Sequence, residues 1–130
     1  MMHTNNFIVV DDDAISNLLC KSALCRYFGA PQIQLFSQPE KALEIISRGG
    51  TQSITTVIFL DINMPTMSGW DFLEIFNQFD HKIRSRFTIY MLSSSVDEND
   101  REMARLNPLV QGFLLKPINA EVLSSFFVFS

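Results

Sequence analysis

Short apolar runs recur five times along the chain, and a longer segment with helical periodicity follows each of them. We interpret the runs as strands at residues 7–10, 33–36, 56–60, 88–92 and 112–115. Strands that alternate with helices in this way predict an α/β fold, in which a parallel sheet carries helices on both faces and the crossovers are right-handed. A chain of 130 residues has room for one such domain, which we take to span residues 1–130 with a core at about 6–129.

Capping residues bound the first and last helical segments. We expect Asp13 to cap the first helix, residues 14–28, and Asn119 to cap the last, residues 120–129. Apolar residues at a spacing of three to four predict the inward face of the first helix: Leu19, Cys20, Ala23, Leu24 and Tyr27.

The middle helices also carry start and stop signals. A Gly pair at 49–50 closes the second helix, and the pair Ser95 and Glu98 forms a capping box that predicts the start of the fourth. The third helix follows a loop at 62–68 and carries a core stripe of Phe72, Leu73, Phe76 and Phe79.

Composition excludes several classes of protein. The net charge is -4 and no cluster of Lys and Arg is present, which argues against a nucleic-acid partner. No apolar run approaches the roughly 20 residues that cross a membrane, and the first residues do not form a signal peptide. Cys20 and Cys25 lack metal-site or redox spacing, so we interpret them as small buried side chains. We therefore expect a soluble cytoplasmic protein.

Polar residues follow the predicted strands at their carboxyl ends, where open parallel sheets bind their ligands. The set comprises Asp11, Asp12, Asp61, Asn63, Ser93 and Lys116. Crowded carboxylates repel one another, and a hard cation such as Mg²⁺ relieves that repulsion through oxygen ligands. Lys116 adds a positive charge for an anion, and Ser93 adds a hydroxyl donor. This combination suits a phosphoryl group, whose transfer depends on positioning and charge neutralisation.

Other phosphate and catalytic sites find less support in the chain. Neither GxxxxGK[ST] nor GxGxxG occurs, so nucleotide binding is not indicated. His3 lies near the N-terminus and His81 in a loop between elements, so neither is placed as a general base or a zinc ligand.

Four short motifs stand at the ends of the predicted strands: Val10-Asp11-Asp12, Asp61-Ile62-Asn63-Met64-Pro65, Ser93-Ser94 and Lys116-Pro117. Together, in this order, they resemble the response-regulator receiver family of two-component signalling, over about residues 6–129. The resemblance implies a flavodoxin-like (βα)5 three-layer sandwich with a five-stranded parallel sheet in the order 2-1-3-4-5. It also implies a phosphoprotein that takes a phosphoryl group from a sensor histidine kinase or a histidine phosphotransfer protein.

The resemblance also implies metal ligands and an acceptor. Asp61 would attack the phosphohistidine of the partner. Asp12 and Asp61 would bind Mg²⁺ together with the backbone carbonyl of Asn63, and Asp11 would act through water.

The remaining family positions concern phosphate binding and switching. Ser93 and Lys116 would bind phosphoryl oxygens, and the Lys116–Pro117 bond is often cis in the family. Phe113 stands at the switch-aromatic position, so the surface around the fifth strand and the fourth and fifth predicted helices would change. Two departures from the family pattern concern the size of this switch: Ser93 replaces the commoner Thr, and Phe113 lacks the hydroxyl of Tyr.

Two apolar surfaces are candidates for partners. Ile15 and Leu18 fall outside the inward stripe of the first helix and lie near the acids, so we expect them to form a docking surface for the phosphoryl donor. The last helix is apolar on more than one face, through Val122, Leu123, Phe126, Phe127, Val128 and Phe129. Either its last turn folds back onto the sheet, or it forms a homodimer or effector surface.

The chain ends within the last predicted helix, so we expect a stand-alone receiver without an output domain. It would act as a relay intermediate or as a diffusible switch on an unknown downstream protein. One alternative is a small Mg²⁺-dependent phosphohydrolase with an aspartyl-phosphate intermediate. That enzyme needs a second acid where Asn63 stands, and an inserted cap for which the chain has no segment. Another is a degenerate receiver that serves as a binding scaffold, against which the intact site residues argue.

Overall fold

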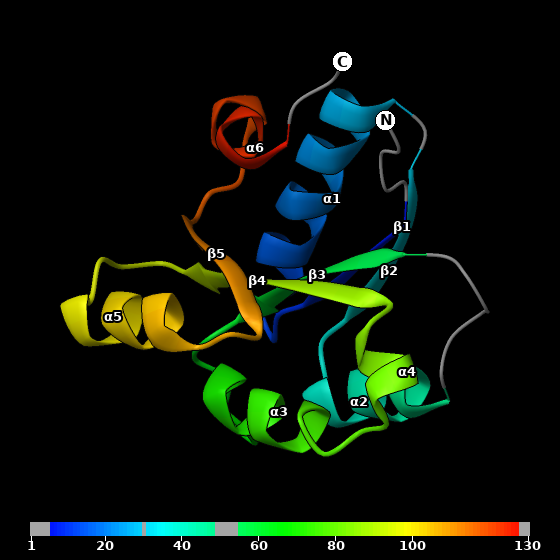
Figure 1. The fold of residues 1–130 in the computed structure, drawn as a ribbon. Coiled ribbons are helices and arrows are strands. Elements are labelled where there is room, and N and C mark those ends of the chain that lie inside the picture. The colour runs from blue at the N-terminus through cyan, green and yellow to red at the C-terminus, as the bar shows by residue number, and fades with distance from the viewer. Residues whose placement is uncertain (1–5, 30, 49–54, 128–130) are drawn as a thin grey trace.

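Five strands form one parallel sheet in the computed structural model, which describes residues 6–29, 31–48 and 55–127 (Figure 1). They are β1 (Asn6–Val10), β2 (Gln32–Phe36), β3 (Thr56–Asp61), β4 (Phe87–Ser93) and β5 (Val110–Leu115). Their order is β2-β1-β3-β4-β5, so the predicted sheet is confirmed. β3 lies in the middle and pairs with β1 and β4 in parallel register.

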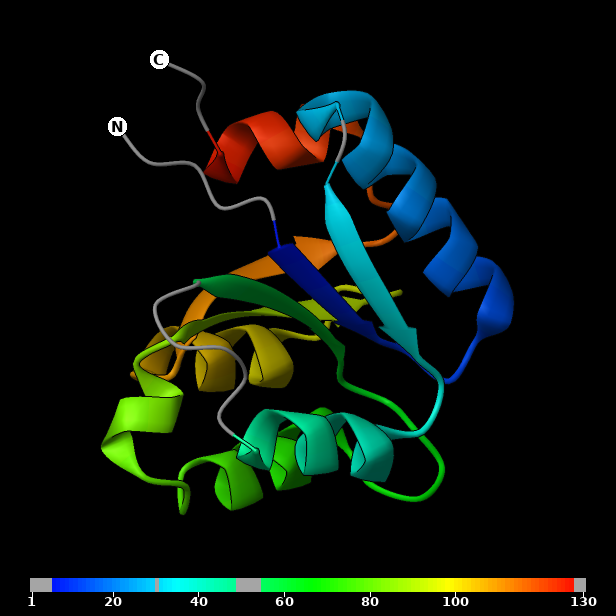
Figure 2. The same cartoon turned by 90° about the vertical axis from the view of Figure 1, so that its right-hand side faces the viewer.

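Helices cover both faces of the sheet, as the alternating pattern predicted (Figures 1 and 2). They are α1 (Ala14–Phe28), α2 (Pro39–Ser47), α3 (Gly69–Phe76), α4 (His81–Arg84), α5 (Glu98–Leu106) and α6 (Ala120–Phe126). α1 and α6 lie on one face, and α2, α3 and α5 lie on the other. None of the helices in the described ranges is both long and apolar enough to cross a membrane.

The middle strand contributes to both hydrophobic cores. Ile58 and Leu60 face the core under α2, α3 and α5, whereas Val57 and Phe59 face the core under α1 and α6. All four are 3% exposed or less. A strand buried on both faces has no polar alternation, which is why residues 56–60 read as a continuous apolar run.

Two of the three predicted helix caps are confirmed. The side chain of Asp13 accepts hydrogen bonds at the start of α1, and that of Asn119 accepts one from the amide of Val122 at the start of α6. The predicted capping box at Ser95 is wrong, because α5 is capped by Asp97, whose side chain accepts from two amides of the first turn. Ser95 stays in the preceding turn, where the Ser93 hydroxyl bonds to its backbone.

The third predicted helix is shorter than its apolar stripe. α3 ends at Phe76, so Phe79 lies beyond it, although the two rings still contact at a centroid distance of 5.9 Å. The short helix α4 follows and was not predicted, because four residues carry no periodicity. Asp80 caps α4, and His81, which we expected in a loop, is its first residue. The second helix ends at Ser47, and the Gly pair 49–50 lies outside the described residues.

The inward face of α1 differs from the prediction at one position. Cys20, Ala23 and Leu24 are buried as expected, but Leu19 is 53% exposed. Asn17 takes its place on the buried face, at 5% exposure, because it precedes Cys20 by three residues and Leu24 by seven. Cys20 and Cys25 are both free, and Cys20 alone is fully buried.

The described part of the C-terminal segment packs onto the molecule. α6 ends at Phe126, and the Phe127 ring lies 5.1 Å from that of Tyr90 on β4. The Tyr27 hydroxyl of α1 donates a hydrogen bond to the carbonyl of Phe127. Of the two readings of this segment, the folded-back one therefore describes residues up to 127, while Phe126 keeps 38% of its surface exposed. Residues 128 and 129 lie outside the described ranges.

Candidate functional site

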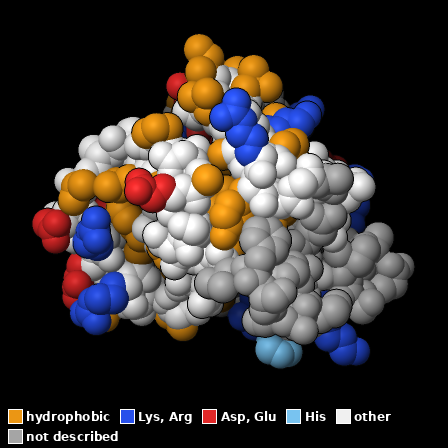
Figure 3. Space-filling model, turned by 90° about the horizontal axis from the view of Figure 1, so that it is seen from above, with side chains coloured by type: hydrophobic (Ala, Val, Ile, Leu, Met, Phe, Trp, Pro, Cys, Tyr) orange, Lys and Arg blue, Asp and Glu red, His pale blue; other side chains and the backbone are white. Residues whose placement is uncertain are grey.

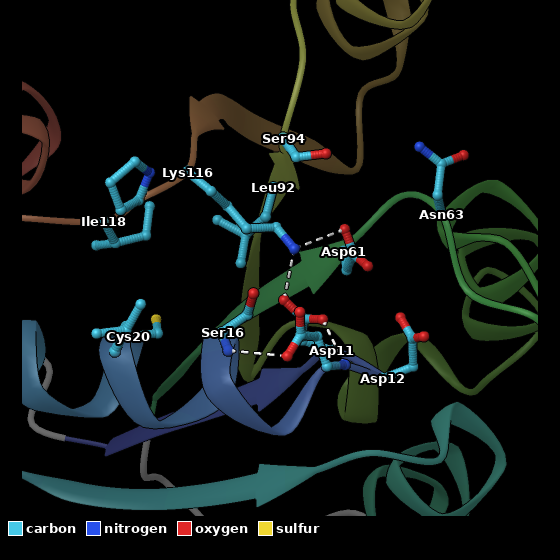
Figure 4. Close-up of a pocket in the computed structure, with 13 residues that line it drawn as sticks. Asp11, Asp12, Ser16, Cys20, Asp61, Asn63, Leu92, Ser94, Lys116 and Ile118 are labelled. Atoms are coloured by element: carbon cyan, nitrogen blue, oxygen red, sulfur yellow. Dashed lines mark hydrogen bonds and ion pairs between the residues drawn. The ribbon is translucent and has the colours of Figure 1, made fainter.

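Three carboxylates gather where β1 and β3 end. Val10 pairs with Leu60 in the sheet, so the residues that follow them along the chain, Asp11 and Asp61, lie side by side. Both are buried, at 1% and 5% exposure, whereas the neighbouring Asp12 is exposed. One oxygen from each of Asp11, Asp12 and Asp61 lies within 4.8 Å of the other two. Figure 4 shows the three side chains turned toward the same space.

The Lys116 side chain reaches these acids from the end of β5. Its ammonium nitrogen lies 2.7 Å from Oδ2 of Asp11 and 3.3 Å from Oδ1 of Asp61 (Figure 4). The backbone amide of Lys116 donates to the carbonyl of Ser93, which continues the β4–β5 pairing by one residue. The Lys116–Pro117 peptide bond is cis, as the resemblance implied.

Burial and the neighbouring charges shift the pKa values of Asp61 and Lys116. Burial, the charge of Asp11 and, to a lesser extent, Asp12 raise the pKa of Asp61 to about 6, although Lys116 opposes them. For Lys116, burial alone would lower the pKa, but the two carboxylates outweigh it and the pKa is raised. Asp61 is therefore ionised at neutral pH, and Lys116 remains a cation there.

A cavity of about 370 Å³ opens beside the acids. Its lining includes the three acids, Asn63 and Lys116, together with Ser16, Leu19, Cys20, Leu92, Ser94 and Ile118 (Figure 4). Burial first, and then the charge of Asp11, raise the pKa of the Cys20 thiol to about 12, so this wall of the cavity is neutral. The cavity thus has a charged end at the sheet and an apolar wall along α1.

The donor set fits a hard divalent cation. The site is built from carboxylates and the amide residue Asn63, and no His lies among the described residues that line it. Such an oxygen-rich site is the kind that Mg²⁺ prefers. Asp12 forms no hydrogen bond or ion pair with another described residue, so its oxygens are available. The residues present therefore fit the magnesium ion that the sequence implied.

The loop after β3 is held tightly against Asp61. The amide of Gly69 donates to the carbonyl of Ile62 at 2.7 Å and closes the loop that carries Asn63. A Cβ at Gly69 would lie 2.7 Å from the carbonyl oxygen of Asp61 and 2.9 Å from Cε of Met91. Glycine is therefore required here for close approach of the two backbones.

Ser93 and Ser94 lie differently with respect to the cavity. Ser93 is 1% exposed, and its hydroxyl donates to the carbonyl of Ser95 at 2.6 Å instead of pointing into the cavity. The next residue, Ser94, is exposed and lines the cavity. A hydrogen bond from Ser93 to a phosphoryl group would require its hydroxyl to leave Ser95.

The predicted switch position, Phe113, is half-buried on β5. The guanidinium carbon of Arg101, in the first turns of α5, lies 5.4 Å from the centre of the Phe113 ring, within the range of a cation–π contact. The same helix is tied to α3, because the indole nitrogen of Trp70 donates to Asp100 at 3.1 Å. Phe113 is therefore covered by a helix that also contacts α3.

The predicted docking residues lie on the exposed face of α1. Ile15 is 68% exposed and Leu18 is 61% exposed, and Leu19 extends the same apolar surface to the cavity wall. Figure 3, which views the molecule from the side of α1 and α6, shows hydrophobic side chains at the surface there.

One residue near the site was missed by our reading of the sequence. The side-chain amide of Asn17 donates to the carbonyl of Asp11 at 2.8 Å and more weakly to that of Phe36 at 3.5 Å. The signal was present, since Asn17 continues the i, i+3, i+7 stripe of Cys20 and Leu24 toward the N-terminus of α1.

Comparisons with known proteins agree with this geometry. Residues 7–127 match the family described as the response regulator receiver domain, so the chain belongs to that family. No curated protein matches the chain. The chain is therefore a phosphoacceptor signalling domain, and the acidic group of Asp11, Asp12 and Asp61 fits the phosphorylation site of such domains.

Solved structures of similar fold include receivers from three bacteria. A response regulator receiver protein from Dyadobacter fermentans is 27% identical with a TM-score of 0.79, and 92% of this chain and 95% of that chain are covered. A two component response regulator from Cytophaga hutchinsonii is 26% identical with a TM-score of 0.83, over 95% and 94%. The fold is shared with the chemotaxis response regulator CheY4 of Vibrio cholerae. That protein is 20% identical with a TM-score of 0.71, and 95% of each chain is covered.

Proposed function

We propose that Asp61 is the residue that accepts the phosphoryl group. The observation that carries this proposal is the position of its carboxylate, which ends the middle strand, lies 3.3 Å from the Lys116 ammonium and opens on the cavity. Asp11 is already paired with Lys116 at 2.7 Å and is more deeply buried. Asp12 lies farther out on the surface. Of the three acids, Asp61 has both an ion pair to orient it and an open side for attack.

The reaction is a transfer from a phosphohistidine. An oxygen of Asp61 forms a bond to phosphorus while the nitrogen–phosphorus bond breaks, and the electron pair of that bond stays on the donor imidazole. Lys116 is placed to bind a phosphoryl oxygen by releasing Asp61, and the Ser93 hydroxyl can bind another by leaving Ser95. Although the pKa of Asp61 is raised to about 6, the ionised, nucleophilic carboxylate is still the main form at neutral pH.

Asp12, Asp61 and the backbone carbonyl of Asn63 would hold Mg²⁺, with Asp11 acting through a water molecule. The ion supplies charge neutralisation for the crowded acids and for the phosphoryl oxygens. This chain's own contribution is to keep one oxygen from each of three carboxylates within 4.8 Å of the others, where two adjacent strands end.

The donor is a sensor histidine kinase or a histidine phosphotransfer protein, which docks on Ile15 and Leu18 in the cytoplasm. Glu at both positions should slow partner-driven phosphorylation about tenfold or more by placing charge in an apolar contact. Phosphorylation from a small donor should not change, because neither side chain belongs to the cavity lining. Equal rates with the partner before and after the substitutions would refute this docking site.

The output surface comprises β5, α5 and α6, and Phe113 responds to phosphorylation within it. The target is a downstream protein, reached either by relay or by a diffusible switch, and α6 is the surface through which a homodimer would form. Sedimentation over a concentration series, with and without a phosphoryl donor, tests the dimer. Monomer under every condition would leave α6 as a helix that only closes the core.

The direct test of the proposed function is intact mass spectrometry after incubation with Mg²⁺ and a small phosphoryl donor. One added phosphoryl group is expected, and it should be absent without Mg²⁺ and in Asp61→Asn. The matched control is Asp71→Asn, an exposed acid in the first turn of α3 that accepts a hydrogen bond from the Ser68 amide and does not line the cavity. Addition to Asp61→Asn at the same rate would move the acceptor to another residue, and no addition to the unchanged chain would indicate a binding scaffold.

A further inference from the structure

The turn between β1 and α1 holds two of the three acids, and its backbone is tied down at three points. The amide of Asp11 donates to the carbonyl of Phe36 at 3.0 Å, and the amide of Asp13 donates to Oδ1 of Asp11 at 2.9 Å. The third tie is the 2.8 Å bond from the side chain of Asn17 to the carbonyl of Asp11. That carbonyl belongs to the peptide unit that joins Asp11 to Asp12.

Burial of the Asn17 side chain lowers the stability of the fold. Asn17 lies on the buried face of α1 at 5% exposure, among Cys20, Ala23 and Leu24. Its side-chain oxygen has no hydrogen-bond partner among the described residues. A buried, half-satisfied amide is less favourable than an apolar side chain of the same shape. Packing alone therefore does not account for asparagine at this position.

The orientation of Asp12 explains what the bond achieves. Asp12 makes no side-chain hydrogen bond or ion pair to another described residue, so only the backbone that carries it places its carboxylate near Asp61. Rotation of the Asp11–Asp12 peptide would turn that carboxylate away from Asp61. The Asn17 side chain holds the Asp11–Asp12 peptide through its bond to the Asp11 carbonyl. Its weaker 3.5 Å contact to the Phe36 carbonyl links the turn to the end of β2.

We propose that Asn17 is a positioning residue of the acid site, which holds the Asp11–Asp12 peptide so that both carboxylates face Asp61. This inference rests on the proposed function in that the three acids are taken to bind a divalent cation. Asn17 itself does not line the cavity, so it acts through the turn and not by contact with a ligand.

The test compares Asn17→Leu with the unchanged chain, because leucine has nearly the shape of asparagine and lacks its donor. Mg²⁺ binding is measured by calorimetry without any phosphoryl donor, at a temperature where both proteins are folded. We expect affinity to fall about tenfold, the lower end of the effect of losing an outer partner of a metal site. Phosphorylation by a small donor should then need more Mg²⁺ for half-saturation but approach the same maximal rate.

Ala23→Gly is the matched control, since it weakens the same helix on the same face without touching the turn. It should lower stability and leave Mg²⁺ affinity unchanged. A structural role alone for Asn17 would give the same pattern as this control. Unchanged Mg²⁺ affinity in folded Asn17→Leu would therefore overturn the proposal.

A second measurement needs no metal. Amide hydrogen exchange at Asp11 and Asp13 should become several-fold faster in Asn17→Leu, because the turn has lost one of its three ties, and should not change in Ala23→Gly. Unchanged exchange in Asn17→Leu would overturn the inference whether or not Mg²⁺ binds. If the unchanged chain binds Mg²⁺ but accepts no phosphoryl group, the proposed function fails while the two comparisons still test Asn17.

Discussion

The middle of the sheet and its carboxyl edge are equally buried, yet they are built from opposite chemistry. Leu60 and Asp61 are consecutive residues of β3, and Val10 and Asp11 are consecutive at the end of β1, and all four are 5% exposed or less. Burial stabilises the leucine and the valine, whereas it penalises the carboxylates. The site is therefore held in place by the free energy of the core beneath it.

Removing a large core ring should have the largest effect. Phe59 lies at 0% exposure on β3, against Phe7, Tyr90 and Phe127, so Phe59→Ala should lower the free energy of unfolding by about 4 kcal/mol. Urea unfolding measures this change. The ring packs in the core under α1 and α6 and does not line the cavity, so Mg²⁺ affinity of the folded variant should stay the same. A large loss of affinity would contradict the separation between the middle and the edge.

Removing the half-buried cation of the edge, Lys116, should come next. Lys116→Met leaves Asp11 buried without its 2.7 Å partner, so the metal-free fold should lose about 3 kcal/mol. Thermal unfolding with and without Mg²⁺ tests this, since a divalent cation should restore part of the loss. Lys82→Met, at an exposed position of α4, should change little. Equal melting temperatures for the two variants would show that Asp11 does not need Lys116 as a partner for stability.

The loop after β3 connects the two regions. In Gly69→Ala the new methyl group would lie 2.7 Å from the carbonyl oxygen of Asp61, and a backbone atom must move to admit it. We expect a loss of about 2 kcal/mol in stability together with weaker Mg²⁺ binding. A variant that keeps full Mg²⁺ affinity would show that the loop adjusts without moving Asp61.

Neutralising Asp61 should have the smallest effect, and of the opposite sign. The folded pKa of Asp61, about 6, is raised above its ordinary value of 3.8, so the folded chain binds the proton more tightly and loses stability as pH rises between these values. Without metal, Asp61→Asn should therefore be more stable at pH 7.5 by roughly 1 to 2 kcal/mol, and by much less at pH 4. Urea unfolding at both pH values measures this. A destabilised variant at pH 7.5 would mean that the ion pair with Lys116 outweighs burial.

The sheet and the acids could be predicted because both depend on simple rules. Buried parallel strands read as apolar runs, and the residues that end them converge on one edge, so Asp11, Asp61 and Lys116 were found from position alone. Details set by tertiary contacts could not be predicted. The Ser93 hydroxyl bonds to its own turn, Leu19 lies on the exposed side of α1 beside the cavity, and α4 is too short for any period.

The hydrogen bond between Trp70 and Asp100 gives the molecule an optical probe of its own. Trp70 is the only tryptophan in the chain, and its indole is bonded across from α3 to α5. Its emission therefore depends on whether that bond and its half-buried surroundings persist. Any event at the acid site that shifts α5, the helix whose Arg101 covers Phe113, would be read directly from intrinsic fluorescence, without a label and in real time.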